Sequence, residues 1–373
     1  MDRTKRVSRK RSTIRPPEMT SRERIIAAMN FQPVDHIPVY DLLRNDAVIS
    51  FYAGERLTVK DGFRIACEAS AACLDATRNL EGPTANGRSE VKGGIWKGMV
   101  MRHERWTWWV EHHPIRQLPD ASEWVKRYTR YCERWQPSRT YINGYRARYH
   151  RYERLAPGLV VLHDPSSPGF DPAYHNVGWE HFSVLVYEKP DLISTWLEAL
   201  CEKELRRIHA IADPDLSPVV LTFSDIACKS GLMFSPELLR REFVPRLARI
   251  QKAWKSHGIR CLFHSDGDLS EILEDLIDAG IDGVNPLELC VNYDIYKVSK
   301  KYGKRIFLAG GVDVSNLLVF ASEEEIRQEV EKVIRTCGRG SGLWIGSTTE
   351  LGNRVPLANF KALVETARSI TPS

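Results

Sequence analysis

The sequence contains no long hydrophobic run. None of its apolar stretches approaches the roughly 20 residues that a membrane-spanning helix needs. No hydrophobic segment follows the basic N-terminus, as it would in a secretory signal. We therefore expect a soluble, cytoplasmic protein without a membrane partner. With 373 residues, 43% of them hydrophobic, the chain is long enough for one large α/β barrel or for two smaller domains.

Cysteine pairs at metal-binding spacing are also missing. The eight cysteines are scattered along the chain, and no two of them stand in a C-x-x-C arrangement. This spacing excludes a disulfide scaffold and a zinc ribbon, and it is typical of a protein in a reducing compartment. We expect most of these cysteines to be small core residues.

The body of the chain has no marked surplus of either charge. Residues 1–15 hold seven Lys or Arg against Asp2 alone, which leaves 46 basic and 47 acidic residues in the rest. The net charge of +5 therefore belongs to the N-terminal segment, and we expect residues 1–17 to form a disordered, solvated tail. Contact of this tail with an acidic partner or nucleic acid is the alternative, although we do not expect nucleic acid as a partner.

From residue 18 to residue 373, short apolar runs alternate with helical patterns. Thr20 and Glu23 form a capping box, which predicts the start of the first helix. Eight βα units in succession predict a closed (β/α)8 TIM barrel. The eight strands are expected to begin at Ile37, Leu74, Leu159, Val219, Ile259, Ile281, Ile306 and Leu343.

A different pattern over residues 91–113 predicts a β-hairpin insertion, because hydrophobic residues alternate there between glycines. Its aromatic residues allow two interpretations. They could form a wall beside a ligand, or they could pack on the body, which we favour because exposed clusters of tryptophan are unusual. The residues concerned are Trp106, Trp108, Trp109, His112 and His113.

Residues 119–154 are polar and rich in Arg and Tyr. We expect a helix over residues 121–135 and irregular structure after Pro137. Basic residues interleaved with aromatic ones are one signature of RNA binding, but acidic residues dilute this run, so a solvated helix is favoured. The interleaved residues are Arg127, Tyr128, Arg130, Tyr131 and Arg134.

The strand that ends at His264 leads into a turn with Asp266 and Gly267, and other predicted strands also end at polar residues. In a barrel, the carboxyl ends of all strands meet at one mouth. Any single residue of this kind could cap a strand or a helix. Several carboxylates and histidines around one barrel mouth indicate a bound cation, a polar substrate or proton transfer. Those expected at the mouth are Asp41, His163, Asp164, Asp225, His264, Asp266, Glu288, Asp313 and Glu350.

The motifs of the chain, taken in order, resemble the uroporphyrinogen decarboxylase superfamily. The resemblance spans about residues 20–370 and implies a TIM barrel. It rests on Thr20 to Ile25, Pro33 to Val39, Ser224-Asp225-Ile226, Gly231 to Pro236, His264-Ser265-Asp266-Gly267, Asn285-Pro286, Gly310 to Asp313, Gly346 to Glu350 and Val355 to Phe360.

Two branches of this superfamily suggest different chemistry. Its decarboxylases carry an Arg-Gln-Ala-Gly-Arg motif after the first strand, where this chain has only Arg44. In its cobamide-dependent methyltransferases, a His-x-Cys on the turn and a Cys after the last strand bind zinc. The matching positions here are His264, Asp266 and Glu350, which implies a divalent metal site that could hold zinc. Cys228 and Cys290 are alternative ligands.

The resemblance therefore favours a corrinoid-linked, metal-assisted methyltransferase that acts on a methoxy or methylthio donor. Asp225 and His264 would be catalytic, and a corrinoid protein would be the partner. One alternative is a decarboxylase of a uroporphyrinogen-like tetrapyrrole, in which Asp225 holds the pyrrole N–H groups. Another is a non-catalytic corrinoid- or tetrapyrrole-binding protein, and a dimer is one candidate oligomeric state. Substrate-binding residues are expected to be Asp41, Arg44, Lys229, Asn285, Glu288 and Asp313.

Overall fold

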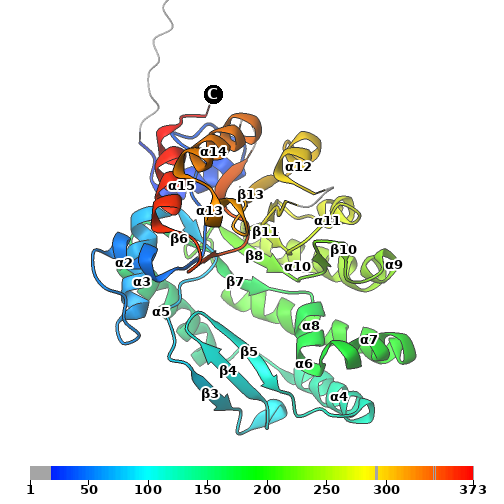
Figure 1. Cartoon of the computed structure of the whole chain (residues 1–373). Helices are drawn as coiled ribbons and strands as arrows, with labels where there is room; N and C mark the ends of the chain where they lie inside the picture. Colours follow the sequence, from blue (N-terminus) through cyan, green and yellow to red (C-terminus); the bar gives the residue numbers. More distant parts are fainter. Residues whose placement is uncertain (1–17, 290–292, 339, 341, 373) are drawn as a thin grey trace, which may run out of the picture.

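Parallel strands lie side by side around a central axis in the computed structural model (Figure 1), which describes residues 18–289, 293–338, 340 and 342–372. The expected tail and Cys290 lie outside the described residues. Six strands form one parallel sheet in the order β14-β13-β12-β11-β8-β7. They are β7 (His163–Ser166), β8 (Val219–Phe223), β11 (Arg260–His264), β12 (Gly283–Asn285), β13 (Phe307–Val312) and β14 (Leu343–Ser347).

The remaining contacts close this sheet into a ring. Val39 bridges to β14, and Tyr40 bridges to β2 (Ala76–Thr77). β2 pairs with β6 (Val160–Val161), which lies just before β7 in the chain. A Cβ atom at Gly346 would lie 1.7 Å from the carbonyl oxygen of Tyr40, so only glycine fits where the first and last strands meet. The predicted (β/α)8 barrel is confirmed.

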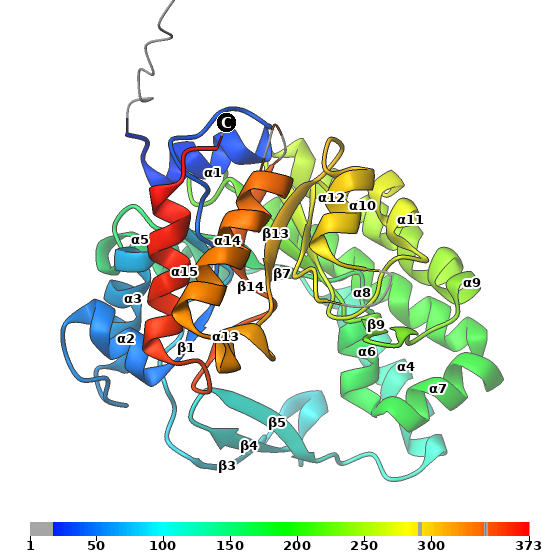
Figure 2. The ribbon, with the colours of Figure 1, turned by 45° about the horizontal axis from the view of Figure 1, so that its top comes forward.

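Helices cover the outside of the barrel, as Figure 2 shows for α10, α11, α12, α14 and α15. The predicted capping box at Thr20 is present. The helices are α1 (Ser21–Met29), α2 (Asp46–Ala53), α3 (Gly62–Cys73), α4 (Leu118–Arg134), α5 (Arg139–Leu155), α6 (Phe170–Val177), α7 (Trp179–Glu188), α8 (Pro190–Ile211), α9 (Pro236–Leu238), α10 (Val244–Ser256), α11 (Leu273–Asp278), α12 (Ile295–Tyr302), α13 (Leu317–Phe320), α14 (Glu323–Cys337) and α15 (Leu357–Ser369), with a π-helical turn, η2 (Leu239–Phe243), before α10.

Helix α5 corrects the expectation of irregular structure after Pro137. Ser138 caps it, and its buried face consists of Tyr145, Tyr149 and Tyr152. Tyrosine rings can bury apolar area if each hydroxyl finds a partner. The hydroxyl of Tyr149 donates to the carbonyl oxygen of Leu162 at 2.7 Å. The helical period was present in the sequence, but in tyrosines rather than in aliphatic residues.

The insertion is a three-stranded antiparallel sheet in the order β3-β4-β5. Its hairpin of β4 (Val100–Glu104) and β5 (Thr107–His112) confirms the prediction, and a short 3-10 helix, η1 (Gly94–Trp96), precedes it. The strand β3 (Gly87–Glu90) was not predicted, because its sequence is polar and its residues are largely exposed. In Figures 1 and 2 the sheet lies outside the ring of barrel strands.

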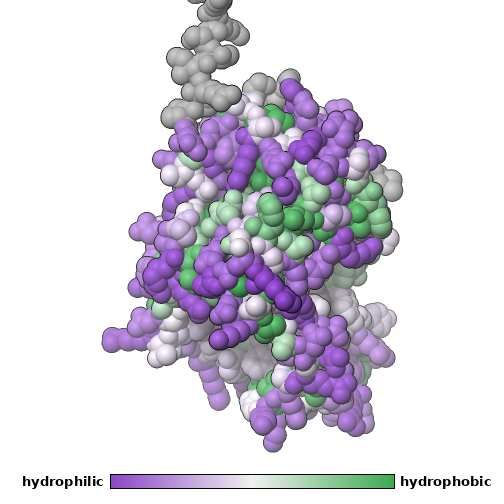
Figure 3. Space-filling model, turned by 60° about the vertical axis from the view of Figure 1, so that its left-hand side comes forward, coloured by the Kyte–Doolittle hydropathy of each residue, from purple (hydrophilic) through white to green (hydrophobic). Residues whose placement is uncertain are grey.

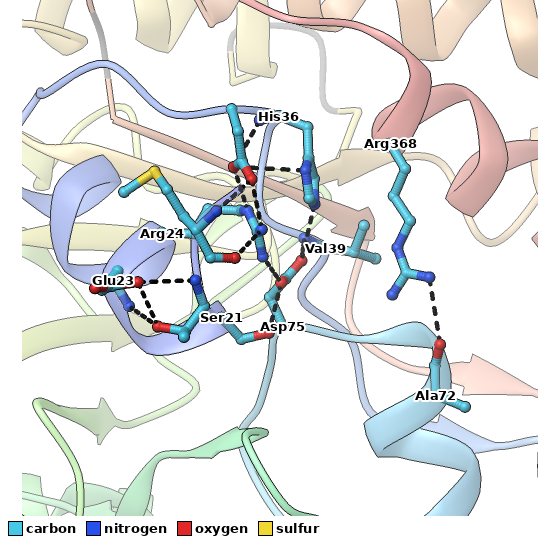
Figure 4. Close-up of polar contacts among 11 residues, drawn as sticks. Ser21, Glu23, Arg24, His36, Val39, Ala72, Asp75 and Arg368 are labelled. Carbon is cyan, nitrogen blue, oxygen red and sulfur yellow. Dashed lines mark hydrogen bonds and ion pairs between the residues drawn. The ribbon is translucent and has the colours of Figure 1, made fainter. Parts of the chain in front are cut away.

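A buried charge network ties α1 to the first two strands (Figure 4). Arg24 donates to Asp35 at 2.6 Å and also to Asp75, which in turn accepts from the backbone N–H of Val39 at 2.8 Å. Burial opposes the charge of Asp35, but hydrogen bonds from Arg24 and two backbone N–H groups hold its pKa well below the usual range. Loss of one partner would leave buried carboxylates uncompensated, which costs about 3–5 kcal/mol.

In the face seen in Figure 3, hydrophilic side chains cover most of the surface. No helix in the described part of the chain is both long enough and apolar enough to cross a membrane. The short pair of β1 (Leu43–Arg44) and β15 (Leu351–Gly352) follows the first and last barrel strands. It therefore extends the barrel wall at the carboxyl ends of the strands.

Candidate metal and substrate site

The carboxyl ends of the barrel strands open into a cavity of about 790 Å³. This volume is within the range of small-molecule sites. The lining comes from barrel strands, from the segments that follow them, and from β5 and α5, so rigid elements position most of it. The lining residues are Leu42, Arg44, Arg78, Asn79, Trp108, Arg148, Asp164, Pro165, Leu221, Phe223, Asp225, His264, Asp266, Thr349 and Glu350.

His264, the last residue of β11, is only 3% exposed. Its Nδ1 lies 2.6 Å from Oδ1 of Asn285, and the amide of Asn285 donates to the carbonyl oxygen of Ala309 at 3.0 Å. Because the amide nitrogen is used there, the amide oxygen accepts from Nδ1–H, which leaves a lone pair on Nε2. Burial, followed by the positive charge of Arg78, lowers the pKa of His264 to about 4. The imidazole is therefore neutral at physiological pH.

Asp225 and Asp266 complete a cluster with His264, in which one ligand atom of each lies within 4.8 Å of the others. Oδ1 of Asp225 accepts from the backbone N–H of Asp266 at 3.1 Å. Oδ1 of Asp266 is buried, lies 3.6 Å from Nε2 of His264 and has no hydrogen-bond partner among the described residues. Burial raises the pKa of Asp266, and the nearby Glu350 adds to this.

This donor set fits a divalent cation. Two carboxylates and a neutral imidazole are ordinary ligands of such ions, and a buried carboxylate oxygen without a partner is costly unless something binds it. Gly267 shapes the turn at the cluster: its φ is +87°, and a Cβ atom there would lie 2.5 Å from the backbone nitrogen of Cys228. The turn after β11 thus packs directly on the loop after β8.

Glu350, predicted as the third metal ligand, lies in the same cavity but in other contacts. Arg44 donates to both of its carboxylate oxygens, at 2.8 and 2.9 Å, and Arg78 donates to Oε2 at 2.8 Å. Arg44 also pairs with Glu81. The geometry thus brings Asp225, rather than Glu350, beside His264 and Asp266. The role of Glu350 as a ligand stays a prediction.

Asp41 and Glu288, both predicted to bind substrate, form hydrogen bonds within the protein instead. Asp41 is buried and accepts from the hydroxyl and N–H of Ser347, both at 2.9 Å, so it links the first strand to β14. Burial raises the pKa of Asp41 to about 6. Glu288 accepts from the N–H of Gly267 at 2.9 Å and so supports the turn after His264. Neither residue lines the cavity, and their substrate contacts stay predictions.

Asp313, Lys229 and Cys228 also lie outside the cavity lining. Asp313 accepts from the backbone N–H of Ser315 at 2.8 Å. This is a local capping contact, the alternative to a role in substrate binding. Lys229 is exposed on the loop after β8. Cys228 is exposed as well, and a hydrogen bond with Ser230 lowers the pKa of its thiol. Their functional roles remain untested.

His163 was expected at the mouth, but the structure turns it the other way. Its ring packs on Tyr145 of α5 and on Trp254 of α10, with ring centroids 6.0 and 5.0 Å apart. Nδ1 lies 2.7 Å from the hydroxyl of Tyr145, and Nε2 lies 3.1 Å from the carbonyl oxygen of Asp213. Burial lowers its pKa to about 4. His163 therefore serves packing between the barrel and its helices.

Sequence reasoning missed the arginines Arg78 and Arg148 of the mouth. Arg78 directly follows β2, so the strand-end rule that selected His264 could have found it. Arg148 comes from α5, which was not predicted, and pairs with Asp164. Two tryptophans of the insertion have different surroundings. Trp106 packs on the body and donates to Asp46 at 2.7 Å. Trp108 lines the cavity and is 63% exposed.

The closed barrel and the polar mouth at its carboxyl end define a TIM-barrel protein of enzyme type. A sequence model described as uroporphyrinogen decarboxylase (URO-D) matches residues 172–370, more than half of the chain. The protein belongs to this family and is a uroporphyrinogen decarboxylase-like enzyme. A search of curated protein sequences found no match.

Among solved structures, the chain is similar to a methyltransferase from Methanosarcina mazei, with a TM-score of 0.63 and 17% identity. The alignment covers 94% of this chain and 99% of that protein, so the likeness of fold includes the N-terminal half. An octameric ribulose-1,5-bisphosphate carboxylase/oxygenase from Pyrococcus horikoshii OT3 aligns far more weakly, with a TM-score of 0.28, 10% identity and coverage of 68% of this chain and 56% of that one.

Proposed function

We propose that the protein is a metal-assisted methyltransferase that exchanges a methyl group with a corrinoid carried by a partner protein. The observation that carries the proposal is the cluster of Asp225, His264 and Asp266, with a buried carboxylate oxygen that has no hydrogen-bond partner among the described residues. A divalent cation held there would act as a Lewis acid on a thiol or on the oxygen or sulfur that carries the methyl group. A site with two carboxylates need not prefer zinc.

The residues of the chain would prepare this site in distinct ways. Asn285 keeps the lone pair on His264 Nε2 through its contact with Nδ1. Nη1 of Arg78 lies 3.4 Å from this Nε2, so the guanidinium would give way to a bound cation. Arg44 and Arg78 share Glu350, and Arg44 also pairs with Glu81, so two carboxylates offset the positive charge of the two guanidinium groups beside a cation. Asp225 is positioned to accept a proton from a substrate thiol or hydroxyl that enters the cavity.

The size of the cavity favours a small methyl donor or acceptor inside it and the corrinoid outside it. Its volume of about 790 Å³ corresponds to a drug-sized molecule. A corrinoid macrocycle presented by its own protein would face the open mouth, beside Trp108. The substrate is thus held against the cluster while the methyl partner arrives from solvent.

Demethylation of methylcobalamin by a panel of thiols, followed by absorbance, tests this function. We expect turnover that needs a divalent metal, that stops with a chelator and that is lost in His264→Ala with Asp266→Ala. The double variant of exposed side chains His150→Ala with Asp215→Ala is the matched control and should keep the activity. Turnover that is unchanged by chelator and by the cluster variant would contradict the proposal.

A second candidate function is decarboxylation of a tetrapyrrole acid. The observation in its favour is that Arg44, Arg78 and Arg148 all line the cavity with Asp225, because guanidinium groups bind carboxylates. Turnover of uroporphyrinogen in the presence of chelator, lost in Asp225→Ala, would support it. Binding of the tetrapyrrole without turnover would instead support the non-catalytic alternative.

A further inference from the structure

A second hollow, of about 400 Å³, lies on α4 where η1 of the insertion meets that helix. It shares no residue with the mouth cavity. Its lining differs from the mouth in charge, because it contains arginines and no carboxylate. The lining residues are Ile95, Arg127, Arg130, Tyr131, Arg134 and Trp135.

The three arginines are exposed and share one side of α4, since they stand three and seven residues apart. None of the three guanidinium groups takes part in a hydrogen bond or an ion pair with another described residue. At the mouth, by contrast, Arg44 and Arg78 are both bound to Glu350. Glu123 is close enough to interact electrostatically with Arg130, but no carboxylate in the described part of the chain is bonded to the three guanidinium groups. Such a cluster favours an anion, and the planar fork of arginine matches phosphate oxygens.

Two aromatic rings in the same hollow, those of Tyr131 and Trp135, each pack against another aromatic side chain. Tyr131 is 38% exposed and stacks on Tyr128 with ring centroids 5.7 Å apart, and Trp135 packs edge-on against Tyr141. The ammonium of Lys203 lies over both lining rings, at 5.9 and 5.2 Å from their centroids, and adds a further positive charge. A platform of this kind binds planar groups, and a nucleobase gains about 1–3 kcal/mol from such stacking.

We propose that this hollow binds a nucleoside phosphate, with the phosphate groups on Arg127, Arg130 and Arg134 and the base against Tyr131 and Trp135. Arginines alone would bind any anion, but the exposed ring of Tyr131 and the partly exposed ring of Trp135 fit a ligand that has both a charged and a planar part. The nucleotide could be free or part of single-stranded RNA, and the experiment separates these sources. This proposal is independent of the chemistry at the mouth.

Calorimetric titration of the full chain with ATP, with inorganic tripolyphosphate and with a short oligoadenylate tests the proposal, at about 50 mM salt because such contacts are salt-sensitive. A chelator in every titration removes metal from the mouth. We expect ATP to bind about tenfold more tightly than tripolyphosphate, because only ATP has a base to stack. Oligoadenylate about tenfold tighter than ATP would assign RNA as the source, and equal affinity would assign the free nucleotide.

Two variants locate the binding. Arg127→Gln with Arg130→Gln and Arg134→Gln should weaken ATP binding by about tenfold or more. Tyr131→Ala should weaken ATP and leave tripolyphosphate unchanged. The control replaces the exposed Arg56, Arg146 and Arg154 by Gln, which removes the same charge elsewhere. No binding of ATP or oligoadenylate, tripolyphosphate as tight as ATP, or equal losses in both triple variants would overturn the proposal.

Discussion

The tautomer of His264 is set by one neighbour, Asn285. The hydrogen bond from Nδ1 to Asn285 fixes the ring and leaves the lone pair on Nε2, which lies 3.4 Å from Nη1 of Arg78 and within 4.8 Å of carboxylate oxygens of Asp225 and Asp266. Outer-shell partners of this kind hold a ligand in place and raise its basicity. At the residue scale, the candidate site therefore depends on Asn285 as much as on the atoms that would touch a ligand.

Replacement of Asn285 by Ala should accordingly weaken divalent metal binding about 10- to 100-fold, the usual cost of losing such a partner. Titration calorimetry with zinc and manganese measures the change. Asp313→Ala, which removes a loop cap outside the cavity, provides the control and should bind metal like the native protein. Unchanged affinity in the Asn285 variant would show that the imidazole does not need this contact.

The strand-end rule predicted the central residues of the mouth but not the pairs they form. His264, Asp225 and Asp266 follow apolar runs, so their position could be predicted from sequence. The contacts of Glu350 with Arg44 and Arg78 join residues some 270 or more positions apart, and no local pattern contains that information. His163 also follows an apolar run, but which face of a strand a side chain takes depends on a register that shifts within β7.

At the scale of elements, α5 shows how a helix without an aliphatic stripe can dock. Its tyrosines reach the barrel through hydroxyl contacts, and His163 accepts or donates one of them. The apolar runs of the barrel strands made the fold predictable, whereas α5 and β3 were missed because tyrosines and exposed polar residues carry no clear apolar signal. Tertiary contacts, rather than local pattern, define both elements.

Docking of α5 through a neutral His163 predicts a pH effect on stability. Its pKa is about 4 in the folded protein and about 6.5 when unfolded. The unfolded chain therefore binds the proton first, and stability falls as the pH drops from 6.5 toward 4, by about 2 kcal/mol at pH 4.5.

Urea denaturation at pH 7 and pH 4.5 measures this effect. His163→Phe keeps an aromatic ring but cannot titrate, so its loss of stability between the two pH values should be about 2 kcal/mol smaller than in the native protein. His150→Phe, at an exposed site, should behave like the native protein. An equal loss in the His163 variant would contradict a neutral buried histidine.

At the scale of the molecule, the two ends of the barrel differ in what they contribute, one to stability and the other to the candidate site. The amino-terminal end carries the buried network of Arg24, Asp35 and Asp75, which joins α1 to the strands (Figure 4). The carboxyl end carries the cavity, its paired arginines and the cluster of Asp225, His264 and Asp266. This division is the usual one in TIM barrels, where stability and chemistry occupy opposite faces.

The central claim is that the mouth cluster holds a metal, and metal content per chain tests it most directly. Protein purified without chelator and incubated with zinc, manganese or iron should retain about one divalent ion per chain by mass spectrometry. The ion should be lost in His264→Ala with Asp266→Ala and kept in Glu350→Gln, because Glu350 is engaged by arginines. No ion in the native protein, or an ion kept by the double variant, would contradict the account.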